Sequence, residues 1–213
     1  MADRYALVVD STNNNIKEIP AADRLVADNL LLSGTTPTLT IGDAGAEDTK
    51  IVFDGNAQDF YIGLDDSADD LVIGLGSAVG TTPAISIDEN QVVKFEAAIT
   101  EQATSLTSGT TVALDVRDGG VFEITLGHDI GTFNWSNHAL SGAVSSFIMK
   151  VVQDGTGSRT IAWPDGTNSV TVRWAGNTAP TLSTGAADID VFVFFTTDGG
   201  TNYYGFTAGQ DML

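Results

Sequence analysis

The sequence contains no cysteine, few basic residues and no long apolar run, and each absence excludes a class of protein. Without cysteine, the 213-residue chain forms neither disulfide bonds nor cysteine-based metal sites. Only 9 Lys and Arg stand against 28 Asp and Glu, and the resulting net charge of -19 repels nucleic-acid phosphates and anionic membranes. The apolar run at residues 191–195 is far shorter than the roughly 20 residues of a membrane-spanning helix. We therefore expect no nucleic-acid partner and no membrane insertion.

The first residues also lack the basic and then apolar pattern of a secretory signal peptide. We expect the protein to be made in a cytoplasm and to reach the outside of a cell by lysis or as part of a particle. The strong acidity has three interpretations: solubility, binding of divalent cations, and docking onto a basic partner. Solubility is the usual role of a high net charge, and we favour it.

Strand-like apolar runs that alternate with Gly, Asn and Asp turns predict an all-β protein. We divide the chain into three zones: an N-terminal anchoring leader over residues 1–35, a ladder of short strands over residues 36–96, and a β-sandwich or jelly roll over residues 97–213. In the leader we expect short strands at residues 5–9 and 16–19. Residues 21–32 fit either a short helix or a buried strand.

The ladder of short strands is poor in the side chains that fill a core. The expected strands lie at residues 38–41, 50–53, 60–64, 71–73, 84–87 and 92–95. Only four aromatic residues fall in this zone, and Gly and Asp interrupt its strands. Short strands need neighbours to bury their faces, so we expect other chains to complete this zone.

The C-terminal zone holds 12 of the 17 aromatic residues, which indicates a substantial core. The expected strands lie at residues 112–116, 121–126, 132–135, 146–153, 160–163, 170–174, 190–196 and 202–207. The strand at residues 190–196 is almost entirely apolar, so we expect it to be central and covered on both faces. Residues 97–107 are the expected linker.

Four carboxylates between two expected strands form the candidate metal site: Asp65, Asp66, Asp69 and Asp70. Ca²⁺ is the cofactor that such hard oxygen ligands would bind. The run lacks the alternating ligands, the Gly and the closing Glu of an EF-hand loop. We favour a solvated loop, and Ca²⁺ binding stays open as the alternative.

Aromatic residues in or at the ends of expected strands form the candidate ligand site: Trp163, Trp174, Tyr203 and Tyr204. Such side chains can stack on sugar rings, although core packing is the commoner role of a tryptophan. Successive residues of a strand point to opposite faces, so one of Tyr203 and Tyr204 should be exposed.

No pattern in the chain indicates catalysis. His128, Asp129, Ser136 and His138 lie close together in the sequence, which invites comparison with a catalytic triad. However, the nucleophile elbow Gly-x-Ser-x-Gly is absent, and the two histidines match no recognised metal-site spacing. The sequence also gives no sign of the sugar-binding groove that a glycosidase needs between its two acids. We expect a protein that is not an enzyme.

Two segments that together cover most of the chain carry a resemblance to a known class. The first reads Tyr-Ala-Leu-Val-Val-Asp-Ser-Thr-Asn-Asn from residue 5 and Asp-Ala-Gly-Ala-Glu-Asp-Thr-Lys-Ile-Val-Phe-Asp-Gly from residue 43. The second reads Gln-Asp-Gly-Thr-Gly-Ser-Arg-Thr-Ile-Ala-Trp-Pro from residue 153 and continues from Trp174 to Phe206. Both resemble virion surface proteins of tailed phages of marine bacteria, of the tail-fibre and head-decoration type.

The resemblance implies a homotrimer that is located in the virion, contacts capsid or tail proteins and has no catalytic residues. The repeat-bearing shaft of a long fibre is absent, which leaves a short fibre, a head fibre or a head decoration protein. We therefore expect a non-enzymatic structural protein exposed on a phage particle. The alternative is a carbohydrate-binding module that recognises a host surface glycan.

Overall fold

The computed structural model describes residues 7–10, 15–18 and 28–212, and it confirms the all-β class. The chain forms two compact units, Met1–Ala97 and Ala98–Leu213, and each is described by itself. In the leader, β1 (Leu7–Asp10) pairs antiparallel with β2 (Asn15–Glu18). Of residues 21–32, the first seven lie outside the described part of the chain; residues 28–32 form neither a helix nor a strand and are exposed, so the expected buried strand at residues 30–32 is wrong. The division at residue 35 stays a prediction.

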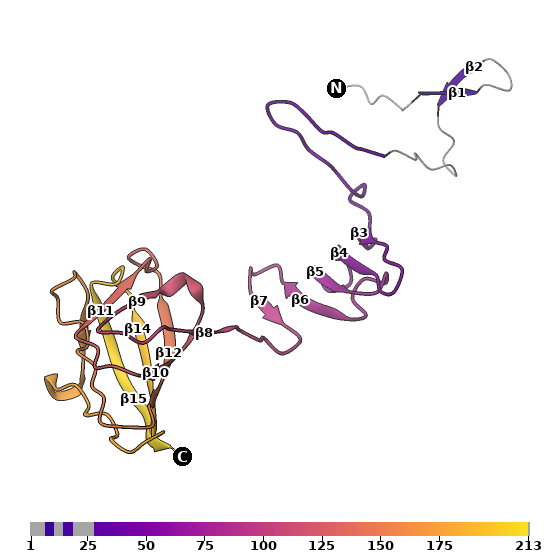
Figure 1. Cartoon of the computed structure of the whole chain (residues 1–213). Helices are drawn as coiled ribbons and strands as arrows, with labels where there is room; N and C mark the ends of the chain where they lie inside the picture. Colours follow the sequence, from indigo (N-terminus) through magenta and orange to yellow (C-terminus); the bar gives the residue numbers. More distant parts are fainter. Residues whose placement is uncertain (1–6, 11–14, 19–27, 213) are drawn as a thin grey trace. The chain divides into compact units, whose positions relative to one another are not determined.

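The first unit contains a five-stranded antiparallel meander whose strands follow one another in chain order (Figure 1). Its strands are β3 (Thr49–Phe53), β4 (Phe60–Asp65), β5 (Asp70–Leu75), β6 (Pro83–Ile87) and β7 (Val93–Phe95). The strand expected at residues 38–41 does not form. Asp69 makes the tight β4–β5 hairpin possible with a φ of 57°, a left-handed conformation that Asp tolerates better than most residues.

One face of the meander is closed by the chain itself. Tyr61 on β4 and Val72 on β5 point to this face, and both are buried. A Cβ on Gly63 would lie 3.1 Å from Val79, which belongs to the loop between β5 and β6. A Cβ on Gly74 would collide with the ring and hydroxyl of Tyr61. Glycine at these two positions therefore lets the loop and the tyrosine pack closely on the sheet.

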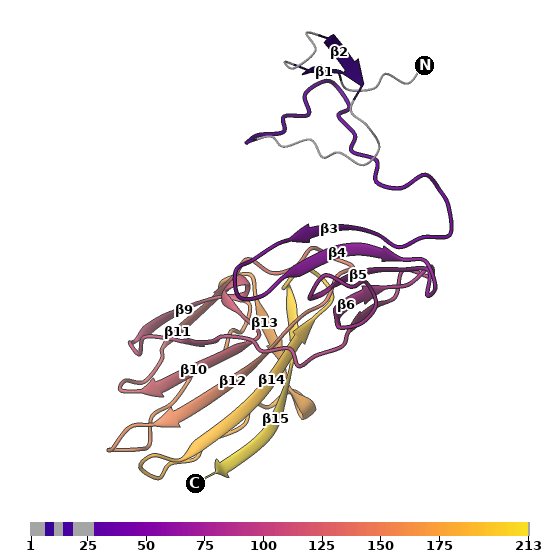
Figure 2. The same cartoon turned by 90° about the vertical axis from the view of Figure 1, so that its right-hand side faces the viewer.

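The second unit contains a six-stranded mixed sheet in the order β13-β15-β14-β12-β10-β8 and a separate pair, β9–β11 (Figure 2). Its strands are β8 (Ala103–Ser105), β9 (Thr111–Asp115), β10 (Val121–Leu126), β11 (Thr132–Ser136), β12 (Ser145–Gln153), β13 (Thr171–Arg173), β14 (Ile189–Thr196) and β15 (Asn202–Met212). Two single 3₁₀ turns, η1 (Val116–Asp118) and η2 (Ala175–Asn177), lie in connections. Strands β12, β14 and β15 pair antiparallel, whereas β8, β10 and β12 pair parallel, as do β9 with β11 and β13 with β15.

Two expectations about this unit are wrong. Strand β8 lies inside the expected linker, because three of its residues pair in parallel with the start of β10. Residues 160–163 form no strand; a single bridge joins Ile161 to Ile130, and Pro164 then follows without an N–H to continue a ladder.

The core of the second unit lies between the inner face of the large sheet and the β9–β11 pair. Trp135 on β11 is at its centre, with edge-to-face contacts to four aromatic rings at centroid distances of 5.0–5.5 Å: Phe133, Phe147, Phe194 and Tyr203. Phe194 on β14 is fully buried against them. Aromatic pairs in this geometry stabilise a core beyond the area that they bury.

Strand β14 is central, as expected, but its two faces differ. Phe192 and Phe194 are fully buried on the inner face, whereas Val191, Val193 and Phe195 on the outer face are only partly buried. Among the described residues, the expectation that both faces of this strand are covered is therefore wrong. The hydrophobic core of the second unit packs on the inner face of this sheet.

Candidate functional site

The open face of the meander is the most unusual surface of the first unit. The antiparallel register aligns apolar side chains across all five strands. The central row is Ile51, Ile62, Ile73, Ile85 and Phe95; the flanking rows add Phe53, Phe60, Leu75, Leu64, Leu71, Ile87 and Val93. We call these twelve residues the meander face.

The meander face is exposed to an extent that is rare for apolar side chains. Ten of its twelve residues have relative exposures between 38% and 56%, and Ile85 and Ile87 are half-buried. A half-exposed Leu, Ile or Phe presents on the order of 80 Å² to water, so the face exposes on the order of 800 Å² of apolar surface. This exceeds the roughly 300–600 Å² of the largest apolar patch on a typical monomer. A patch of this size marks an interaction site.

Charged residues surround the meander face but do not enter its rows. The hairpin between β4 and β5 carries Asp65, Asp66, Asp69 and Asp70 at one end of the sheet. Ser67 donates a hydrogen bond to Asp65 over 2.7 Å, and the backbone N–H of Asp66 donates over 3.1 Å to the carboxylate of Asp48, just before β3. These hydrogen bonds stabilise the turn of the hairpin, so the carboxylates of Asp65 and Asp48 bind groups of the chain itself.

The four carboxylates of this hairpin do not converge into the expected metal site. Across residues 28–212, no group of three or more His, Cys, Asp or Glu side chains is placed to hold a metal ion. Asp65 and Asp70 pair as neighbours at the base of the hairpin, whereas Asp66 and Asp69 lie in the turn itself. The expected Ca²⁺ site is therefore not supported by the geometry of the chain.

The four aromatic residues of the expected ligand site are also not brought together. Tyr203 is fully buried, its hydroxyl lies 2.8 Å from Nδ1 of His138, and burial raises its pKa to about 12. Its assignment to a ligand site is wrong, because it is part of the core. Tyr204 is 45% exposed on the outer face of the sheet, so the expectation that one of the two tyrosines is exposed is confirmed.

Trp163 and Trp174 do lie together, at a ring-centroid distance of 5.4 Å. They line a shallow groove of about 460 Å³ whose polar residues include Asp165, Arg173 and Asn177. This volume lies within the range of about 300–1,000 Å³ typical of small-molecule sites. The Nε1 of Trp174 is buried and has no hydrogen-bond partner among the residues that the structure describes.

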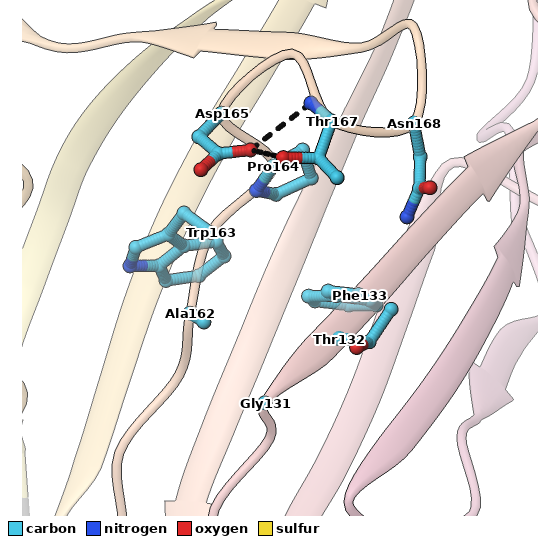
Figure 3. A pocket seen from close by; sticks show the side chains of 9 residues that line it. All are labelled: Gly131, Thr132, Phe133, Ala162, Trp163, Pro164, Asp165, Thr167 and Asn168. Carbon is cyan, nitrogen blue, oxygen red and sulfur yellow. Dashed lines mark hydrogen bonds between the residues drawn. The ribbon is translucent and has the colours of Figure 1, made fainter.

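A smaller pocket of about 120 Å³ lies on the other side of Trp163, between this residue and Phe133 on β11 (Figure 3). Its rim is the turn after Pro164, where Asp165 accepts hydrogen bonds from the backbone N–H and the hydroxyl of Thr167 over 3.0 and 2.6 Å. These bonds lower the pKa of the Asp165 carboxyl, and they show that this carboxyl stabilises the turn. Asn168 donates to Asn134 across the pocket and so joins the turn to β11.

The histidines and Ser136 do not form a catalytic pair. The Nδ1 of His138 faces the hydroxyl of Tyr203, whereas the Ser136 hydroxyl donates to the carbonyl of Leu114 over 3.4 Å. Burial lowers the pKa of His138, whose contact with the Tyr203 hydroxyl gives it a structural position. Asp129 accepts a hydrogen bond from the backbone N–H of Thr160 over 2.9 Å and so fixes a loop.

No protein-family model matches this chain, and comparisons with curated proteins and with solved structures return no significant match. In the described ranges, 7–10, 15–18 and 28–212, no helix is long and apolar enough to cross a membrane.

Proposed function

We propose that this protein is a non-enzymatic structural protein of a phage virion, which self-associates as a homotrimer and is exposed as a short fibre or a head decoration protein. The meander face is the observation that carries the proposal. The five-stranded sheet leaves this apolar face in contact with water, and an apolar patch of this size marks an interaction site. A partner that covers the face would remove this apolar surface from water.

A second copy of the chain is the occupant that this face fits best. Its rows hold no charged side chain, so nothing in it selects a partner of opposite charge. Specific protein interfaces bury about 800 Å² from each partner, which is the order of the area that the meander face exposes. Covering this area contributes about 20 kcal/mol before the costs of association, which is enough to hold copies together. The resemblance to phage virion surface proteins supports three copies.

The self-association is tested by placing a charge at the centre of the meander face. Ile73 lies in the central row on the central strand, and Ile73→Asp leaves a carboxylate where copies meet. Leu140→Asp is the matched control, because Leu140 is 85% exposed in a loop of the second unit. We expect Ile73→Asp to reduce the molar mass in solution to that of one chain and Leu140→Asp to leave it unchanged. An unchanged mass for both variants would remove the basis of the proposal.

The virion location is tested by electron microscopy with gold-labelled antibody against the purified protein. We expect labels on the surface of phage particles, at the head if the protein decorates the capsid and at the tail if it is a short fibre. Labelling of host debris but not of particles would contradict the virion role while leaving self-association intact.

The groove between Trp163 and Trp174 favours a second candidate function, recognition of a host surface glycan. Its two indole rings provide apolar surface, and Arg173 and Asn177 provide polar groups beside them, which is the combination that sugar recognition uses. Binding of the purified protein to immobilised glycans, lost in Arg173→Ala and kept in Thr156→Ala, an exposed residue that does not line the groove, would support it. Absence of binding across bacterial surface glycans would contradict it.

A further inference from the structure

The large sheet of the second unit has its own exposed apolar surface. Its residues lie opposite the core-facing side chains, and the register aligns them over four strands. We call this surface the outer sheet face; it comprises Val121, Ile148, Val152, Val191, Val193, Phe195, Tyr204 and Phe206. The row from Val121 through Ile148 and Val193 to Phe206 crosses the whole of its centre.

Three aromatic rings form a stack on the outer sheet face. Phe195 lies 5.2 Å from Tyr204 and 6.0 Å from Phe206 between ring centroids, with interplanar angles of 29° and 10°. Tyr204 and Phe206 are nevertheless 45% and 54% exposed, and Ile148 is 41% exposed. Exposed aromatic clusters of this kind are enriched in the centres of protein interfaces rather than on free surfaces.

The outer sheet face carries one ion pair, and Glu101 lies at its edge, where it lines a hollow with Val121 and Ile148. Lys150 and Glu123 are register partners on β12 and β10, and Lys150 Nζ lies 3.2 Å from a Glu123 carboxylate oxygen. The chain as a whole carries a net charge of -19, so an area with one ion pair and one further carboxylate is poor in charge. A basic partner gains little attraction at this face, whereas the apolar face of another copy meets few charges there.

The linker between the two units favours a second copy as the occupant. Only seven residues, 96–102, separate the end of β7 from the start of β8, and they span at most about 25 Å. If the meander faces of several copies associate, their second units are held at an effective concentration of the order of millimolar. At this concentration an apolar face meets its equivalent on another copy far more often than any dilute partner.

We propose that the outer sheet face is a second contact between copies of this chain, formed by the second units of the same assembly. This inference rests on the self-association proposed above, but it depends on different residues. Covering the face would also bury the outer side chains of β14, which are only partly buried in the single chain.

The absence of cysteine allows a single introduced thiol to report on this face. Ser146 is exposed on β12 and pairs with Phe195, so Ser146→Cys places a thiol at the edge of the outer sheet face with little change in shape. Ser141→Cys is the matched control, because Ser141 is exposed in the loop before β12. Both variants are studied in the full chain by the rate of maleimide labelling, by oxidative disulfide cross-linking and by molar mass.

We expect the thiol of the Ser146→Cys variant to label at least tenfold more slowly than the thiol of the Ser141→Cys control. We also expect the Ser146→Cys variant to cross-link between copies and the Ser141→Cys control not to do so. Adding Ile148→Lys to the Ser146→Cys chain should restore fast labelling while the meander face still holds the oligomer together.

Three outcomes would overturn this inference. If the protein is an oligomer but both thiols label equally fast, the outer sheet face is not a contact between copies, and the proposed function still stands. If the Ser146→Cys thiol of the oligomer is protected but does not cross-link, the inference is also overturned, because the outer sheet face is then covered by something other than a second copy. A monomer would overturn both proposals.

Discussion

Replacement of Phe194 by Ala tests the assignment of the aromatic core most severely. Phe194 is fully buried on β14 and lies within 5.6 Å of the rings of Trp135, Phe147, Trp163 and Trp174 between centroids. The substitution removes this ring and leaves a cavity that rigid aromatic neighbours fill poorly.

The expected loss in the free energy of unfolding is about 3–5 kcal/mol, at the upper end of that range because several aromatic contacts are lost with the ring. Such a loss is a large fraction of the roughly 5–15 kcal/mol that stabilises a typical domain. The matched control is Leu140→Ala, since Leu140 is 85% exposed and its removal should cost no more than about 0.5 kcal/mol. Phe194→Asp adds a buried charge to the same cavity and should prevent folding.

Tryptophan fluorescence during denaturation with urea is a suitable assay, because all three tryptophans lie in the second unit. We expect a clear shift of the midpoint to lower urea concentration for Phe194→Ala and no shift for Leu140→Ala. A loss below about 1.5 kcal/mol for Phe194→Ala would refute the packing described here.

Four further predictions rest on the charges and the close contacts of the two units. Because the chain carries a net charge of -19, self-association should strengthen as NaCl is raised from about 20 to about 500 mM, measured as a lower dissociation constant in sedimentation equilibrium. Burial lowers the pKa of His138, so the folded state binds fewer protons than the unfolded state near the ordinary pKa of 6.5. The free energy of unfolding should therefore decrease as the pH falls through about 6.5. His138→Gln should remove this part of the pH dependence, measured by urea denaturation. Hydrogen bonds from Asn202 hold the pKa of Asp198 at about 2, so its contribution should be lost only at lower pH, as the pH falls below about 4. Gly74→Ala should destabilise the meander by about 1–3 kcal/mol, because its Cβ collides with Tyr61, and hydrogen exchange should rise in β4 and β5 but not in β14.

The strands of the meander were predictable because each is a short apolar run between Asp, Asn or Gly turns. The alternation of apolar and other residues within these strands also places their apolar side chains on one face, which is harder to recognise from the sequence. Residues such as Phe60, Ile62 and Leu64 follow the period of two that places them on one face, and this signal was present in every strand from β3 to β7. Only the register shows that the five sets lie on the same face and remain exposed.

Long-range pairing in the second unit could not be predicted from local patterns. Strand β8 has three residues and forms because β10 is available as a parallel neighbour, which no local signal encodes. Tyr203 and Tyr204 are adjacent in sequence, and alternation predicts that they differ in exposure. It does not say which one faces the core, because that choice depends on the pairing of β15 with β14.

The molar mass of the wild-type protein in solution, measured by light scattering with and without Ca²⁺, tests the central claim most directly. We predict a mass three times the chain mass of 22.2 kDa, unchanged by Ca²⁺ because the Asp65–Asp70 hairpin does not gather its carboxylates. A mass of one chain under both conditions would contradict the account, since the meander face would then have no second copy to cover it.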